Sequence, residues 1–151
     1  MANKKISELT PKAAQLEDSD LVMISDYNGA TYDTKSVTGA EIRPYKTIIF
    51  AISQSGTAAP TKDWSYESEV TQTFTLARST IGTYTLTASS ALFTSNKTFI
   101  NISLGGSGGA ANIGAYITST TIITFYTTDS TNGSASDSLL DYAQLEIKII
   151  K

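Results

Sequence analysis

The aspartate and glutamate residues of this sequence are candidate catalytic residues, because two paired carboxylates are enough for glycoside hydrolysis. The chain of 151 residues has no histidine and no cysteine. This composition excludes thiol nucleophiles, disulfides, histidine-activated serines and the usual zinc and iron–sulfur sites. The acidic candidates beyond residue 44 are Asp63, Glu67, Glu69, Asp129, Asp137, Asp141 and Glu146. On this inventory of residues alone, the glycosidase class stays open.

Two aromatic residues, Trp64 and Tyr66, are candidate contacts for a glycan. An aromatic ring offers an apolar face against which the C–H face of a sugar can pack. The alternative interpretation is that these rings close one end of a β-sandwich or lie in an interface between subunits.

Two loops resemble ligand-binding motifs. Residues 106–111 satisfy a dinucleotide-binding fingerprint, but the next segment has a strand pattern where the fingerprint needs a helix N-terminus. The oxygen-rich segment 129–137 suggests calcium, yet Gly133 stands where an EF-hand loop needs a ligand. We interpret both as solvated loops. No cofactor and no metal site is therefore predicted.

Charge and hydropathy exclude two further classes of partner. The formal net charge is -3 and the isoelectric point is about 4.8, which disfavours nucleic-acid binding. No apolar run approaches the roughly 18 residues of a membrane-spanning helix, so no membrane contact is expected. The first residues carry two lysines without an apolar stretch behind them, so we expect synthesis in a cytosol.

Residues 44–151 alternate between apolar and polar side chains with a period of two, which is typical of strands with one buried face. The alternation predicts strands around residues 48–52, 70–77, 82–88, 98–104, 115–118, 121–127 and 142–150. Short strands separated by Gly, Ser and Asn turns, without convincing helices, predict an all-β fold. We expect an antiparallel β-sandwich of seven or eight strands.

Residues 1–43 have a different composition, and they predict a small separate module. Residues 21–24 and 31–37 have strand patterns, and Asn28-Gly29 between them suits a two-residue type I′ hairpin turn. Thr38 and Glu41 fit a capping box, which predicts one helical turn before Pro44. A second short helical turn is predicted at residues 12–16.

This module is too small to be stable alone, because pieces of this size normally need disulfides, a metal or association. Four consecutive apolar residues, 21–24, would leave one face of a two-stranded hairpin exposed. The sandwich, a sister chain or a larger assembly must cover it. The predicted assembly interface consists of Ile6, Leu9, Leu16, Leu21, Val22, Met23, Ile24, Val37 and Ile42.

Several short motifs carry a resemblance to bacteriophage virion proteins. In the first module they are Ile6-Ser7-Glu8-Leu9, Leu16, Asp20-Leu21-Val22 and Lys35-Ser36-Val37-Thr38. In the second they are Gln54-Ser55-Gly56-Thr57 with Pro60, Gly82-Thr83-Tyr84, Phe93-Thr94 with Asn96-Lys97, and Leu145-Glu146-Ile147-Lys148. The first set resembles the N-terminal attachment module of phage fibre and tail proteins. The second set resembles a β-sandwich of phage virion proteins.

The resemblance implies a virion structural protein that is not an enzyme and has no catalytic residues. It also implies that residues 1–43 anchor the protein and that residues 44–151 are displayed as a sandwich. It implies a homo-oligomer, commonly a homotrimer, with other virion proteins as partners and assembly in the bacterial host cytoplasm. Because no long fibrous shaft separates the two modules, we expect a short fibre, decoration or adaptor on the head, neck or tail. The alternative is a carbohydrate-binding module that contacts host-surface glycans, with a small carbohydrate-active enzyme as a further alternative.

Overall fold

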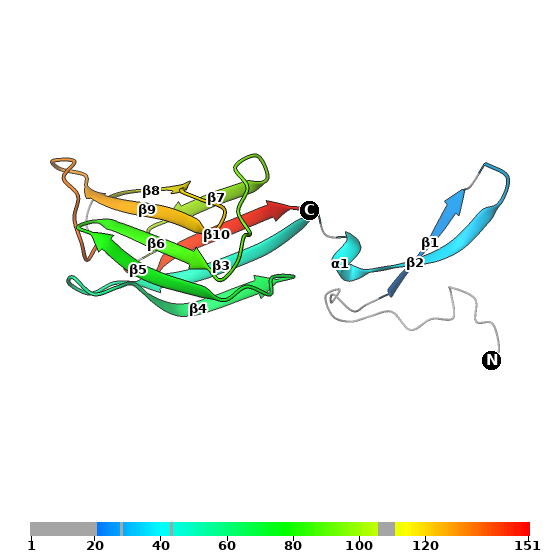
Figure 1. Cartoon of the computed structure of the whole chain (residues 1–151), viewed down its shortest axis with the longest axis horizontal. Helices are drawn as coiled ribbons and strands as arrows, with labels where there is room; N and C mark the ends of the chain where they lie inside the picture. The colour runs from blue at the N-terminus through cyan, green and yellow to red at the C-terminus, as the bar shows by residue number, and fades with distance from the viewer. Residues whose placement is uncertain (1–20, 28, 43, 106–110) are drawn as a thin grey trace. The chain divides into compact units, whose positions relative to one another are not determined.

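The computed structural model describes residues 21–27, 29–42, 44–105 and 111–151. These residues form ten strands and one four-residue helical turn (Figure 1), so the predicted all-β fold class is confirmed. The chain divides into two units, residues 1–43 and residues 44–151. Within the described ranges, no helix is long and apolar enough to cross a membrane.

The first unit contains a β-hairpin of β1 (Leu21–Tyr27) and β2 (Tyr32–Thr38), paired antiparallel. Tyr27 pairs with Tyr32, so residues 28–31 connect the strands and the predicted two-residue turn is wrong. A four-residue connection is also common in hairpins. Gly29 has a φ of 95°, a left-handed conformation that glycine adopts cheaply.

The predicted capping box and helical turn are confirmed by α1 (Gly39–Ile42). The Thr38 backbone amide donates to the Glu41 carboxylate at 2.7 Å, and the Glu41 amide donates to the Thr38 hydroxyl at 3.3 Å. These bonds satisfy two backbone amides that a helix start leaves unpaired. The predicted helical turn at residues 12–16, together with Ile6, Leu9 and Leu16, lies outside the described residues.

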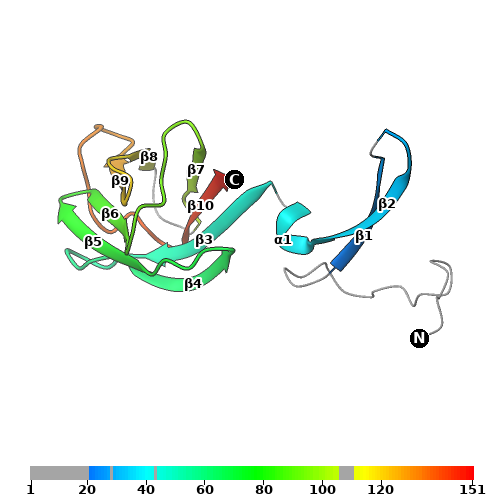
Figure 2. The ribbon, with the colours of Figure 1, turned by 45° about the vertical axis from the view of Figure 1, so that its right-hand side comes forward.

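The second unit is a sandwich of two four-stranded antiparallel sheets. Its strands are β3 (Tyr45–Ser53), β4 (Thr61–Ser68), β5 (Phe74–Thr80), β6 (Thr83–Ala88), β7 (Thr98–Ser103), β8 (Ala111–Ile117), β9 (Ile122–Asp129) and β10 (Ala143–Ile150). One sheet has the order β4-β3-β10-β7 and the other β5-β6-β9-β8. Figures 1 and 2 show them facing each other, with β7 beside β8.

The core lies between the two sheets and is built by the alternating residues of their central strands. In β3, β6 and β10 the predicted apolar face is buried, and in β6 the threonines of the other face are half-buried. The core side chains include Ile48, Phe50, Ile52, Tyr84, Leu86, Ile123, Phe125, Leu145 and Ile147. Phe50 and Phe74 meet across the sheets, edge to face, with ring centroids 5.5 Å apart. Apolar burial of this kind stabilises the sandwich.

The edge strand β4 was not among the predicted strands. Its side chains are exposed at every position except Ser68, so it lacks the apolar alternation of a half-buried strand. The predicted strand at residues 70–77 starts later, at Phe74, and runs on to Thr80. The strand predicted at 115–118 starts earlier, at Ala111. The other predicted strands agree with the structure within a few residues at either end.

Candidate functional site

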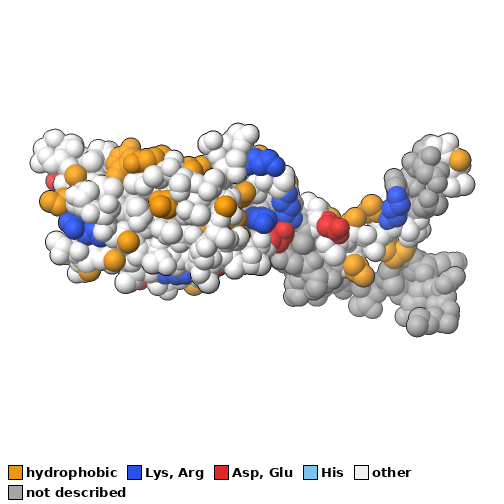
Figure 3. All heavy atoms as spheres, in the orientation of Figure 1, with side chains coloured by type: hydrophobic (Ala, Val, Ile, Leu, Met, Phe, Trp, Pro, Cys, Tyr) orange, Lys and Arg blue, Asp and Glu red, His pale blue; other side chains and the backbone are white. Residues whose placement is uncertain are grey.

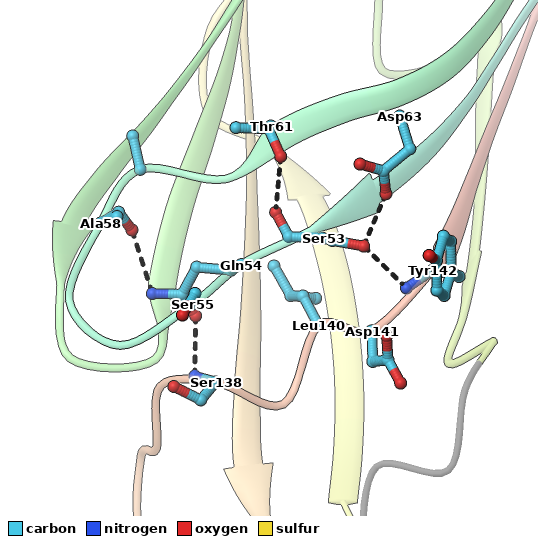
Figure 4. A pocket seen from close by; sticks show the side chains of 11 residues that line it. Ser53, Gln54, Ser55, Ala58, Thr61, Asp63, Ser138, Leu140, Asp141 and Tyr142 are labelled. Atoms are coloured by element: carbon cyan, nitrogen blue, oxygen red, sulfur yellow. Dashed lines mark hydrogen bonds between the residues drawn. The ribbon is translucent and has the colours of Figure 1, made fainter.

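A pocket of about 560 Å³ opens at one end of the sandwich. Its walls come from the end of β3, the following loop and the start of β4, and from the segment just before β10 (Figure 4). The polar residues that line it include Ser53, Gln54, Asp63, Ser138, Asp141 and Tyr142. The pocket lies entirely within the second unit.

Gln54 connects the two walls of the pocket through hydrogen bonds. This side chain is buried, and its Nε2 donates to the carbonyl oxygens of Gly56 at 2.7 Å and Ala58 at 3.0 Å. Its Oε1 accepts hydrogen bonds from the Tyr84 hydroxyl at 2.9 Å and from the Ser138 amide at 2.7 Å. With two donors and two acceptor positions in use, the buried amide has its hydrogen bonds satisfied.

Backbone contacts hold the same two segments. The Gln54 amide donates to the Leu140 carbonyl at 2.9 Å, and the Gly56 amide donates to the Ser138 hydroxyl at 2.8 Å. Ser138 and Tyr142 have φ values of 61° and 49°, which are unusual for residues other than glycine. Such conformations persist only where the surrounding structure holds them. The pocket is therefore a pre-formed feature of the fold.

A β-bulge directs Asp63 to the pocket. Trp64 pairs with Ala51 and Lys62 pairs with Ile52, so Asp63 is the extra residue of β4. The Ser53 hydroxyl donates to Asp63 Oδ2 at 2.5 Å, and Ser53 Oγ accepts from the Tyr142 amide at 3.0 Å. Figure 4 shows Asp63, Ser53 and Tyr142 joined in this way along one side of the pocket.

Asp137 belongs to a structural network beside the pocket. Its carboxylate accepts hydrogen bonds from the Arg78 side chain and the Gly82 amide, and it shares the single proton of the Tyr84 hydroxyl with Gln54. The hydrogen bond from Arg78 is the main reason that the pKa of Asp137 lies well below its ordinary value. Burial is the main reason that the pKa of Tyr84 is raised. An acid held ionised in this way stabilises the fold and is unsuited to donating protons.

The remaining acidic candidates are engaged elsewhere. Glu67, Glu146 and Glu69 form ion pairs with Lys62, Lys148 and Lys151 at 3.8, 3.0 and 2.5 Å respectively. Of the seven acids considered from the sequence, only Asp63 and Asp141 line the pocket. Their proximity was not predicted, because the two residues lie on segments far apart in the sequence.

The oxygen-rich loop has an ordinary local role. In the 129–137 segment, Asp129 Oδ1 accepts from the Thr131 amide at 2.6 Å, and Asn132 Oδ1 accepts from the Ser134 amide at 2.8 Å. The described residues contain no group of acids arranged to hold a metal ion. Residues 106–110 lie outside the described residues, and the strand β8 follows them as the sequence predicts.

Trp64 and Tyr66 lie on the outer face of the sandwich. They pair with Ala51 and Ile49, which alternate with the buried residues of β3. Facing residues of an antiparallel pair share one face of the sheet. The side chains are 57% and 46% exposed. The two rings therefore form an exposed aromatic pair at a sheet edge.

The hairpin exposes much of its apolar surface. Leu21 and Met23 are 69% and 58% exposed, and Ile24 and Ile42 are also exposed. Val22 and Val37 face each other across the strands and are half-buried. Because side chains alternate along a strand, Leu21 and Met23 lie on one face and Val22 and Ile24 on the other. Both faces of the hairpin are thus partly apolar, and Figure 3 shows hydrophobic side chains on the surface of this unit.

Comparison of the chain with protein-family models, curated proteins and solved structures finds no match.

Proposed function

We propose that this chain is an oligomeric structural protein of a bacteriophage particle. In this proposal residues 1–43 anchor it to the head, neck or tail, and the sandwich is displayed as a short fibre, decoration or adaptor. The observation that carries the proposal is the exposed apolar surface of the hairpin, above all Leu21 and Met23. The virion setting rests on the resemblance of the sequence motifs to phage attachment modules.

Association with other subunits would stabilise the hairpin. An isolated two-stranded hairpin is marginally stable in water at best. Covering the exposed part of Leu21, Met23, Ile24 and Ile42 would contribute on the order of 1–2 kcal/mol for each side chain. In a symmetric oligomer the same apolar side chains of every subunit are buried. We propose a homotrimer that also contacts other virion proteins.

The sandwich suits display on a particle surface. Figure 3 shows a visible face that consists mostly of uncharged side chains and backbone. Thr75 and Thr85 lie on the outward side of the sheet β5-β6-β9-β8. Hydroxyl groups keep such a face hydrated without dense charge, and the net charge of -3 disfavours aggregation.

The oligomeric state of the purified full chain tests the docking role. We expect light scattering to report an oligomer for the native chain and a monomer for the double variant Leu21→Ser with Met23→Ser. A matched double variant on the sandwich, Ile81→Ser with Phe99→Ser, removes two side chains of similar exposure and should leave the oligomer intact. A native chain that is monomeric at all concentrations would contradict the proposal.

A second function is favoured by the aromatic pair on β4. Trp64 and Tyr66 lie two residues apart on one exposed face, as a surface for stacking sugar rings requires. We propose that this pair contacts glycans of the host surface, with several copies acting together by avidity. Trp64→Ala should abolish binding on a multivalent glycan array, and the control Phe99→Ala should not. Absence of glycan binding by the native oligomer would remove this function.

A further inference from the structure

We propose that the pocket formed by residues 53–63 and 138–142 binds one neutral, hydroxyl-rich sugar unit of a polysaccharide. In this site Asp63 and Asp141 accept hydrogen bonds from sugar hydroxyls, and the Tyr142 ring packs against the C–H face of the sugar. This inference deepens the second function proposed above, on which it rests, and is independent of the docking role of the hairpin.

The size and rigidity of the pocket suit a small ligand. Its volume of about 560 Å³ lies within the range of small-molecule sites, roughly 300–1,000 Å³. Gln54 joins the two walls through the Gly56 and Ala58 carbonyls on one side and the Ser138 amide on the other. A ligand therefore need not order these loops when it binds, which lowers the cost of binding.

The acceptors required for sugar hydroxyls are present. Asp63 uses Oδ2 for the Ser53 hydroxyl, and among the described residues nothing donates to its Oδ1 or to the Asp141 carboxylate. Hydrogen bonds that involve an ionised carboxylate are stronger than neutral ones. Ser55, Thr61 and other lining residues add hydroxyl groups to the wall.

Tyr142 supplies the apolar contact. Its side chain is 61% exposed although its backbone amide is fixed by Ser53. An exposed ring on a fixed backbone loses little freedom when a ligand packs against it. Sugar rings combine an apolar C–H face with hydroxyls at the rim, and this chemistry matches a tyrosine beside two carboxylates.

The charges select a neutral sugar over an acidic one. Asp63 and Asp141 line the pocket, and none of its lining residues is basic. Lys62, which precedes Asp63, is instead paired with Glu67 and lies 5.0 Å from the Phe50 ring centroid. An anionic sugar would meet two carboxylates of like charge without a compensating cation, which disfavours its binding.

The pocket lies next to the aromatic pair of β4. Asp63 precedes Trp64, and Trp64 pairs with Ala51, two residues before Ser53 on the same face of β3. A sugar chain that fills the pocket can therefore continue toward Trp64. Because Trp64 is the only tryptophan of the chain, its fluorescence also reports ligand binding nearby.

Calorimetric titration of the full chain with defined trisaccharides tests the proposal. The neutral probes are 1,4-linked galactotriose, maltotriose, cellotriose and mannotriose, and trigalacturonate is the anionic counterpart of galactotriose. We expect at least one neutral probe to bind with millimolar affinity or better, with a change in Trp64 fluorescence, and trigalacturonate to bind at least about tenfold more weakly.

Three variants locate the binding. Asp141→Asn and Tyr142→Ala should each weaken binding by about tenfold or more, whereas Tyr142→Phe should keep it because the ring remains. Asp141→Asn removes no hydrogen bond between described residues, so its fold should be retained. The control Tyr116→Ala removes an exposed tyrosine of the other sheet and should change nothing.

Three results would overturn the proposal: no binding of any neutral probe, binding of trigalacturonate as tight as that of the tightest neutral probe, or unchanged binding by Asp141→Asn and Tyr142→Ala. In the last case, loss of binding by Trp64→Ala would show that sugars meet the β4 surface alone. The second function would then stand without the pocket.

Discussion

Arg78 donates two hydrogen bonds to the Asp137 carboxylate, from Nε to Oδ1 at 3.1 Å and from Nη2 to Oδ2 at 2.7 Å. This forked contact joins the strand β5 to the segment that leads into the pocket wall. Both side chains are largely shielded from water, so the pair fixes the position of that segment.

The Arg78–Asp137 contact should make stability fall at acid pH. The pKa of Asp137 is lowered from 3.8 in the folded chain, so its stabilising contribution is present above that value and is lost as the pH falls toward the folded pKa. We expect the native chain to have a higher Tm than Asp137→Asn at pH 7. The difference should narrow below about pH 4. A difference that stays constant down to about pH 2 would contradict this assignment.

Gly82 should be intolerant of alanine. Its φ is +59°, and an added Cβ would lie 2.5 Å from the Thr127 carbonyl oxygen and 2.6 Å from the Ser136 nitrogen. We expect Gly82→Ala to lower the free energy of unfolding by about 2–5 kcal/mol, measured by urea denaturation. Gly133 has a similar φ of +71° but open space, so Gly133→Ala should cost only about 1–2 kcal/mol. Equal costs would show that crowding at Gly82 is relieved by small shifts.

Phe50 should be a main contributor to the stability of the sandwich. It is fully buried and packs edge to face on Phe74 across the sheets. We expect Phe50→Ala to reduce the free energy of unfolding by about 3–5 kcal/mol, because a cavity remains that water does not fill. Phe99→Ala, at an exposed position, should change it by no more than about 0.5 kcal/mol.

Replacement of Gln54 should loosen the pocket walls. Gln54→Leu leaves the Ser138 amide without its acceptor, at a cost of about 1–3 kcal/mol, whereas the Tyr84 hydroxyl keeps Asp137 as an acceptor. We expect faster hydrogen exchange at the Ser138 amide. Exchange at the Thr131 amide, which donates to Asp129 outside this network, should be unchanged. Unaltered exchange at Ser138 would mean that the backbone contacts alone hold the wall.

The strands of the core could be predicted from the sequence because burial on one face leaves a period of two. β6 shows this directly, since Tyr84 and Leu86 are buried between half-buried threonines. The capping box was equally readable, because Thr38 and Glu41 act within four residues of one another. Both features depend on short-range patterns.

The edge strand and the pocket had no such local pattern. β4 pairs with β3 through backbone hydrogen bonds while its side chains face water, so Trp64 and Tyr66 stood out only as single aromatic residues. Asp141 and Tyr142 reach Asp63 only through the folded arrangement of β3 and β10. The left-handed backbone of Tyr142 has no sequence signal, because tyrosine does not favour it.

The position of β10 between β3 and β7 has a consequence for synthesis. β3 and β7 cannot join one sheet until residues 143–150 have left the ribosome. Until then the sheet β4-β3-β10-β7 is incomplete, and β3 and β7 have unpaired strand edges. The pairing of β3 with β10 spans almost the whole unit, and such non-local pairing predicts slow folding. Chaperones that shield nascent β-strands should therefore raise the yield of native protein.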